Sequence, residues 1–99
     1  MVGGRVLGDR YRLDERIAAG GMGTVWAATD QRLQRRVAVK LLKDDLAHDA
    51  RFVARFEREA RAAAALSHPN VASVFDYGDD GGTPFIVMEL VPGRDLARV

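Results

Sequence analysis

The stretch that decides the fold class is Gly20-Gly21-Met22-Gly23, followed without a break by Thr24-Val-Trp-Ala-Ala-Thr29. Before the glycines, apolar side chains stand at positions 11, 13 and 17, an alternation that predicts a strand with one buried face. After them, β-branched and aromatic residues favour a second strand, so the glycines form a turn between two strands. A Walker loop and a dinucleotide-binding fingerprint both require a helix after the glycines, and this pattern excludes them.

Three more segments have the composition of strands. Val37–Leu42 is a short apolar run that suits a strand covered on both faces, and Val71–Tyr77 and Thr83–Met88 flank a glycine-rich turn at 78–82. Together with the first two, these segments predict a sheet of five antiparallel strands.

A long helix is predicted from Asp49, which suits the N-cap position, to Leu66. This segment contains no glycine or proline, and Ala62–Ala65 has the highest helix propensity available. Pro69 cannot continue a helix and restricts the residue before it. Apolar residues at helical spacing form one stripe on the predicted helix, made of Phe52, Phe56, Ala63 and Leu66. The predicted fold class is therefore α+β, a five-stranded antiparallel sheet with one long helix packed on it.

Composition excludes several classes of protein. The chain has 99 residues and no cysteine, which excludes a disulfide framework, and two isolated histidines argue against a zinc site. Fifteen basic and fourteen acidic residues are interspersed and give a net charge of +1, so no basic patch for nucleic acid is expected. No apolar run reaches the ~18–20 residues of a membrane span, and the first residues are too polar for a signal peptide. We expect a cytoplasmic protein that holds no metal by its own side chains.

Lys40 and Glu59 are the two charged residues whose positions need an explanation. Only two of the fifteen basic residues are lysines, and Lys40 lies inside the apolar run Val37–Leu42, on the same side as Ala38. Glu59 falls inside the predicted apolar stripe of the helix, where a carboxylate is costly unless it meets a cation. The sequence thus predicts a Lys40–Glu59 ion pair. Two simpler interpretations stay open, a Lys40 that extends to solvent and a Glu59 that pairs with Arg55 one helical turn earlier.

A glycine cluster between strands is, taken alone, most often only a turn. Glycine also lets backbone N–H groups approach an oligophosphate closely, because no Cβ stands in the way. The functional interpretation of residues 20–23 is therefore a flexible hairpin that covers phosphates.

Five motifs occur together in the order and spacing of a known family. They are Ile17-Ala-Ala-Gly-Gly-Met-Gly-Thr-Val25, Asp30-Gln-Arg-Leu33 before Val37-Ala-Val-Lys40, Phe56-Glu-Arg-Glu59-Ala60, His68-Pro69-Asn70-Val71 and Pro84-Phe-Ile-Val-Met-Glu89. With these motifs, the chain from Arg10 to Leu96 resembles the N-terminal lobe of a protein kinase, specifically of the bacterial serine/threonine kinases of eukaryotic type.

The resemblance implies an ATP site. A kinase uses the glycine-rich loop over the ATP phosphates, a strand lysine on the α- and β-phosphates and a helix glutamate that holds this lysine, and these last two roles fall on Lys40 and Glu59. Met88 would be the gatekeeper, while the Glu89 carbonyl and the Val91 N–H would face the adenine edge. The residues implied in nucleotide binding are Ile17, Ala18, Ala19, Gly20, Gly21, Met22, Gly23, Thr24, Val25, Ala38, Lys40, Met88, Glu89 and Val91. Among them Ile17, Val25 and Ala38 would enclose the adenine ring.

Two departures from the family pattern bear on activity. Ala18 replaces the first glycine of the loop, at a cost of roughly 1 kcal/mol if a left-handed backbone is needed there. The catalytic base and the Mg²⁺ ligands of the family do not occur in these 99 residues, so Mg²⁺ would be held through the nucleotide and a further lobe. We expect the 99-residue chain alone to be inactive.

The expected organisation is an N-terminal tail at 1–9, the ATP-binding lobe at 10–91, and the exit from the hinge with the start of another helix at 92–99. The implied function is transfer of the ATP γ-phosphoryl group to a serine or threonine hydroxyl of a protein substrate. The alternatives are a truncated regulatory module that forms a homodimer through this lobe, and a nucleotide-binding module without transferase activity. A reading frame that continues into His-Arg-Asp and Asp-Phe-Gly segments separates the first possibility from the other two, and a membrane anchor downstream stays open.

Overall fold

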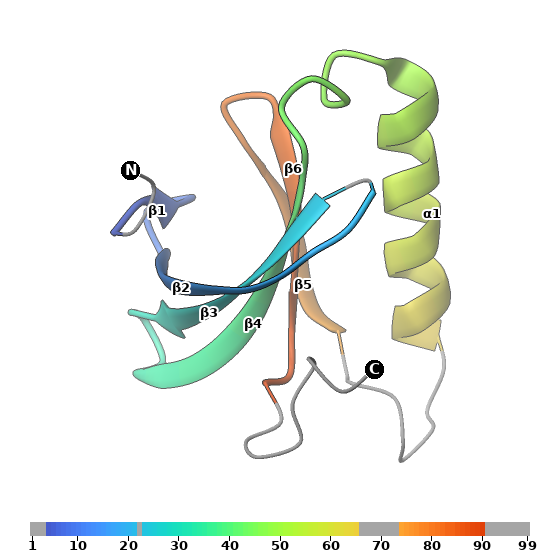
Figure 1. Cartoon of the computed structure of the whole chain (residues 1–99). Coiled ribbons are helices and arrows are strands. Elements are labelled where there is room, and N and C mark those ends of the chain that lie inside the picture. Colours follow the sequence, from blue (N-terminus) through green and yellow to red (C-terminus); the bar gives the residue numbers. More distant parts are fainter. Residues whose placement is uncertain (1–3, 22, 66–73, 91–99) are drawn as a thin grey trace.

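The computed structural model describes residues 4–21, 23–65 and 74–90. These residues form an antiparallel sheet in the order β1-β2-β3-β4-β6-β5, with the helix α1 along one side of it (Figure 1). The elements are β1 (Val6–Leu7), β2 (Tyr11–Ala19), β3 (Gly23–Asp30), β4 (Arg35–Leu42), α1 (Ala50–Ala65), β5 (Val74–Asp80) and β6 (Thr83–Met88). The predicted α+β class is confirmed, and each of the five predicted strands has its counterpart.

The sheet has one strand more than predicted. β1 lies in the segment expected as a tail, where Val6 pairs with Arg12 and Leu7 pairs with Tyr11. Leu7 is fully buried in the core. A strand of two residues is too short to show the alternation on which the sequence prediction depends.

The hairpin between β5 and β6 is tighter than predicted. Its loop is Gly81–Gly82, with φ angles of 61° and 92°, so both residues adopt the left-handed backbone that two-residue hairpin loops require. β5 therefore extends through Gly78, which pairs with Phe85. The Phe85 ring covers this glycine so closely that a Cβ on Gly78 would stand 2.7 Å from the ring. Of the predicted turn at 78–82, only residues 81 and 82 form the turn, and residues 78–80 belong to β5.

Hydrogen bonds between its two ends curl the sheet. The Tyr11 hydroxyl on β2 donates to Asp76 on β5 at 2.8 Å, and the Gly8 N–H donates to Asp80 at 3.0 Å. Because β2 and β5 are not neighbours in the strand order, these bonds bring distant strands together. The curl encloses the larger hydrophobic cluster, made of Leu7, Tyr11, Leu13, Trp26, Ala28, Val37, Val39, Leu41, Phe85 and Val87.

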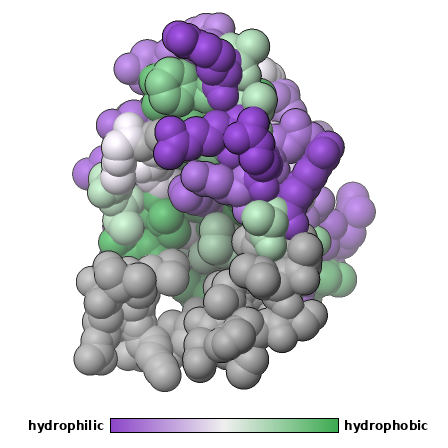
Figure 2. All heavy atoms as spheres, turned by 90° about the vertical axis from the view of Figure 1, so that its right-hand side faces the viewer, coloured by the Kyte–Doolittle hydropathy of each residue, from purple (hydrophilic) through white to green (hydrophobic). Residues whose placement is uncertain are grey.

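The other face of the sheet packs against α1. Phe56 and Ala60 of the helix are buried together with Leu42 and Ile86 of the sheet. The helix begins as predicted, because the Asp49 carboxylate accepts a hydrogen bond from the Arg51 N–H at 2.9 Å and thereby caps its first turn. Figure 2 shows hydrophilic side chains over most of the described part of the side on which α1 lies, as expected for an amphipathic helix.

The buried Asp30 closes the hairpin between β3 and β4. Its carboxylate accepts two hydrogen bonds from the Arg10 guanidinium, at 2.9 and 2.8 Å, and two from the N–H groups of Arg32 and Leu33. These donors, first of all Arg10, lower the pKa of Asp30 to about 2. Asp30 is 1% exposed, so its charge is stabilised almost entirely by the protein.

Candidate functional site

Four residues of β3, β4 and β6 that are predicted to bind a nucleotide share one face of the sheet. Val25 of β3 pairs directly with Lys40 of β4, and Ala38 of β4 pairs with Met88 of β6. Paired residues of an antiparallel sheet point to the same side, as do residues two apart on one strand. Ile86 pairs with Lys40 and packs in the cluster under α1, so this is the face that α1 covers in part. The structure therefore brings Val25, Ala38, Lys40 and Met88 together.

Lys40 and Glu59 lie at ion-pair distance. The Lys40 Nζ is 4.0 Å from Glu59 Oε1, and the two side chains are 34% and 47% exposed. The other carboxylate oxygen, Oε2, lies 3.8 Å from the Nε of Arg55. Both pairings considered from the sequence are thus present at once, and Lys40 is only partly accessible to solvent.

The predicted place of Glu59 within the apolar stripe is wrong. The helix residues packed on the sheet are Val53, Phe56 and Ala60, and at about 100° per residue Glu59 lies about 90° from their centre. Glu59 therefore stands at the edge of the buried face and is about half exposed. The stripe was misplaced because Ala63 and Leu66 were used to define it, and the side chains of these two residues lie outside the described part of the chain.

The three loop glycines differ in what the protein requires of them. The Gly20 N–H donates to the Gly23 carbonyl at 2.8 Å, which closes the turn between β2 and β3. A Cβ on Gly23 would overlap the carbonyl oxygen of Leu41, so the approach of β4 requires glycine there. A Cβ on Gly21 would meet no atom within 4 Å. Gly21 thus borders open space, and no contact among the described residues requires glycine at this position.

Ala18 carries no backbone strain. Among the described residues, the non-glycine residues with positive φ are Asp9 and Gln34, so Ala18 does not adopt the left-handed conformation. Its pairing with Val25 is that of an ordinary strand residue. The penalty considered for the replacement of the first loop glycine does not arise in this structure.

The remaining predicted nucleotide-binding residues are more dispersed. Ala19 pairs with Thr24 on the opposite face of the sheet from Lys40, and the Thr24 hydroxyl accepts a hydrogen bond from the Trp26 indole at 3.0 Å. These two residues have only their backbone available to the nucleotide face. Ile17 is half-buried in an irregularity of the β2–β3 ladder, and Glu89 is exposed after β6. Met22 and Val91 lie outside the described residues.

No group of three or more His, Cys, Asp or Glu side chains able to hold a metal ion occurs within residues 4–21, 23–65 and 74–90. In the same described part of the chain, no helix is long and apolar enough to cross a membrane.

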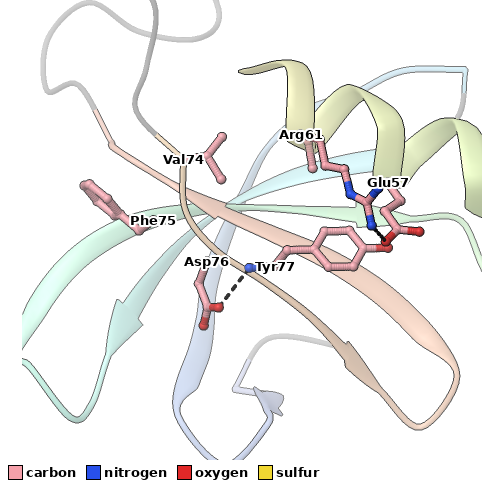
Figure 3. Close-up of a pocket in the computed structure, with 7 residues that line it drawn as sticks. Glu57, Arg61, Val74, Phe75, Asp76 and Tyr77 are labelled. Carbon is pink, nitrogen blue, oxygen red and sulfur yellow. Dashed lines mark hydrogen bonds and ion pairs between the residues drawn. The ribbon is translucent and has the colours of Figure 1, made fainter. Parts of the chain in front are cut away.

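A pocket of about 400 Å³ lies between α1 and β5 (Figure 3). Its lining residues are Glu57, Ala60, Arg61, Val74, Phe75, Asp76 and Tyr77. On the helix side of the pocket, the Arg61 guanidinium donates a hydrogen bond to the Glu57 carboxylate at 2.8 Å. The Tyr77 ring lies beside this pair, whereas the Phe75 ring points away from it (Figure 3). None of the residues predicted to bind a nucleotide lines this pocket. This pocket could not be recognised from the sequence, because its lining comes from two elements that are distant in the chain.

Comparison with known proteins agrees with this geometry. Residues 11–99 match the protein kinase domain family. The serine/threonine-protein kinase PknA of Mycobacterium tuberculosis is 52% identical over 101 residues, which cover 97% of this chain and 23% of PknA. The probable serine/threonine-protein kinase CE0033 of Corynebacterium efficiens is 54% identical over 98 residues, which cover 95% of this chain and 15% of that protein. The chain thus spans less than a quarter of these curated relatives.

Solved structures give the same result. The kinase domain of Mycobacterium tuberculosis PknI has a TM-score of 0.73 and 30% identity, with 99% of this chain and 39% of that chain covered. A structure described as the apo form of PpkA-294 has a TM-score of 0.79 and 27% identity, with 99% and 41% covered. Since the family match covers most of the chain and the fold matches the N-terminal part of these domains, this chain belongs to the protein kinase family, as an N-terminal lobe of the bacterial serine/threonine type.

Proposed function

We propose that this chain is the ATP-binding lobe of an enzyme that transfers the γ-phosphoryl group of ATP to serine or threonine hydroxyls of a protein. The observation that carries the proposal is the Lys40 ammonium, which shares a sheet face with Val25, Ala38 and Met88 and has Glu59 at 4.0 Å. A half-buried cation next to a small apolar surface suits a ligand that combines a flat ring with phosphates.

The roles of the chain in this reaction are binding and orientation. Val25, Ala38 and Ile17 would contact the adenine ring, and the backbone after Met88 would bind its polar edge. Lys40 would hold the α- and β-phosphates, Glu59 would keep Lys40 directed at them, and the N–H groups around Gly21 would cover the phosphates from above.

In the chemical step, the bond between the γ-phosphorus and the bridging oxygen breaks and a bond from the γ-phosphorus to the substrate hydroxyl oxygen forms. ADP leaves, and the hydroxyl proton passes to a base that these 99 residues do not supply. Fixed positive charge at Lys40 contributes by holding the phosphates in line for the transfer.

The test is phosphorylation of a serine- and threonine-containing protein by a chain that carries this sequence together with a catalytic lobe. Lys40→Met is expected to lower the rate at least about a hundredfold, because it removes the cation and keeps most of the apolar stem. Lys43→Met is the matched control, since Lys43 is the only other lysine and is exposed after β4. Equal activity of the two variants, or unfolding of Lys40→Met by circular dichroism, would contradict the proposal.

A second candidate function, a module that forms homodimers, is favoured by exposed apolar side chains. Leu33 in the β3–β4 hairpin and Phe75 on β5 are exposed, and the Arg35 guanidinium lies 4.2 Å from the Phe75 ring centroid. Sedimentation of the 99-residue chain with and without Leu33→Ser tests this candidate. A monomer at all concentrations would refute it and leave the ATP-binding proposal intact.

A further inference from the structure

The Glu59 carboxylate lies between two cations that approach different oxygens. Lys40 on β4 is 4.0 Å from Oε1, and Arg55 on α1 is 3.8 Å from Oε2. Because each cation faces its own oxygen, the two contacts coexist and do not compete for one lone pair. The two cations together favour one rotation of the carboxylate about its terminal bond.

A second ion pair on the same helix serves as an internal reference. Arg61 and Glu57 have the same four-residue spacing as Arg55 and Glu59, with the arginine one turn after the glutamate rather than before it. Their contact closes to a hydrogen bond of 2.8 Å. The Arg55–Glu59 contact stays longer, and Glu59 differs from Glu57 in facing a cation of the sheet as well. The longer contact thus goes with two differences, the reversed order of the two residues along the helix and the second cation that Glu59 faces on the sheet.

We propose that Arg55 is a positioning residue of the nucleotide site, which holds Oε2 of Glu59 so that Oε1 faces Lys40. The inference deepens the proposed function, because Lys40 is useful to the phosphates only when its ammonium is held in place. Arg55 is on the same helix as Glu59, so the two move together whatever the position of α1 against the sheet. Lys40 then meets a carboxylate that is already oriented.

The kinetic test uses a chain that carries this sequence together with a catalytic lobe. Arg55→Gln is expected to lower kcat/KM for ATP by a factor of about 1.5 to 2, the size expected from loss of one exposed helical ion pair. Arg61→Gln is the matched control, because it breaks an ion pair of the same spacing on the same helix and is expected to leave kcat/KM unchanged. Arg55→Lys is expected to restore most of the loss.

A double-mutant cycle separates positioning from a general effect on the helix. In a Glu59→Gln background, Arg55→Gln is expected to have no further effect on kcat/KM, because no carboxylate is left to orient. An equal effect of Arg55→Gln with and without Glu59, or an equal loss in Arg61→Gln, would overturn the inference.

A test without catalysis uses the fact that the chain has only two lysines, Lys40 and Lys43. With isotope-labelled lysine, the 99-residue chain gives two side-chain signals, which Lys43→Arg assigns. Arg55→Gln is expected to move the Lys40 signal toward its position in Glu59→Gln, while Arg61→Gln leaves it in place. A Lys40 signal that stays still or moves the opposite way would refute the role of Arg55. The proposed function would fail separately, through full activity of Lys40→Met.

Discussion

Asp30 and Glu59 are two carboxylates of the same small lobe that meet arginine in opposite ways. Asp30 is 1% exposed and accepts four hydrogen bonds, including two from Arg10 at 2.9 and 2.8 Å. Glu59 is 47% exposed, and its two cations stay at 4.0 and 3.8 Å. The first carboxylate is saturated by its partners, and the second is not.

The difference separates a structural ion pair from one available for function. A buried carboxylate with all its hydrogen bonds made contributes strongly to stability, since loss of one partner leaves an uncompensated charge or unpaired donors. A half-exposed pair at longer distance contributes little to stability, because water screens it. Glu59 and Lys40 can therefore change partners when a ligand arrives, whereas Asp30 and Arg10 hold β2 to the β3–β4 hairpin.

The largest effect is expected from a substitution that removes the fully hydrogen-bonded carboxylate of Asp30. Asp30→Ala should lower the free energy of unfolding by about 3 kcal/mol, because it leaves Arg10 and two backbone N–H groups without their acceptor. Glu59→Gln should change the same quantity by less than about 0.5 kcal/mol. Urea unfolding followed by circular dichroism measures both. Equal effects of the two substitutions would show that Asp30 is no more important for stability than Glu59.

The next largest effect is expected at one of two loop glycines, Gly23 and Gly21. Gly23→Ala should destabilise the chain by about 2 kcal/mol, because its Cβ would overlap the Leu41 carbonyl and force β4 away. Gly21→Ala should leave stability within about 0.5 kcal/mol, since its Cβ meets no atom within 4 Å, and should weaken ATP binding instead. Thermal unfolding and calorimetric ATP titration separate the two. A stable Gly23→Ala variant would contradict the structural role of this glycine.

The free energy of unfolding should fall at acid pH because of Asp30. Its folded pKa of about 2 lies below the ordinary value of 3.8, mainly because of the Arg10 hydrogen bonds. The ionised form is thus favoured by folding, and this contribution is present above about pH 4 and lost as the pH falls through about 2. The loss should reach about 2 kcal/mol. Unfolding of the native chain and of Asp30→Asn at several pH values checks it, since the variant should lack this part of the dependence.

Replacement of Tyr11 should have a smaller effect at neutral pH, and this residue should also produce a pH dependence at the alkaline end. Burial first, and then the hydrogen bond to Asp76, raise the pKa of Tyr11 from 10.0 to about 12. The protonated form is therefore favoured by folding, and its contribution is present below pH 10 and lost as the pH rises through about 12. Tyr11→Phe should cost about 1 kcal/mol at neutral pH through the lost hydrogen bond. Its unfolding free energy should also lose the decline above pH 10, and an unchanged decline would show that another group titrates there.

The smallest effect concerns Ala18. Because the φ angle of Ala18 is not positive, Ala18→Gly should relieve no backbone strain. The substitution should lower the free energy of unfolding by about 0.5 kcal/mol, because glycine gives the unfolded chain more conformational entropy. ATP affinity should stay the same in calorimetry. A clear rise in affinity would show that nucleotide binding needs a backbone conformation at this position that differs from the one described.

The sequence by itself determined the class of the fold and the family. The glycines before Thr24 and the alternation around them identified a strand turn, and the glycine- and proline-free segment after Asp49 identified the helix, because these signals depend on neighbours in the chain. Lys40 and Glu59 were found the same way, as charges inside apolar patterns, together with the spacing of five motifs. Periodicity could not place Glu59 correctly, since which residues define the buried face depends on where the sheet contacts the helix.

Only the tertiary structure decided which of these residues meet and which are held fast. Three such contacts join segments that are distant in the chain. They are the hydrogen bond between Tyr11 and Asp76 that closes the sheet, the ion pair of the buried Asp30 with Arg10, and the close approach of Leu41 that requires glycine at position 23. Such contacts leave no periodic signal, because each depends on the three-dimensional approach of one strand or side chain to another. The same is true of the Lys40–Glu59 pair, because Oε1 of Glu59 faces Lys40 only after α1 has packed on the sheet.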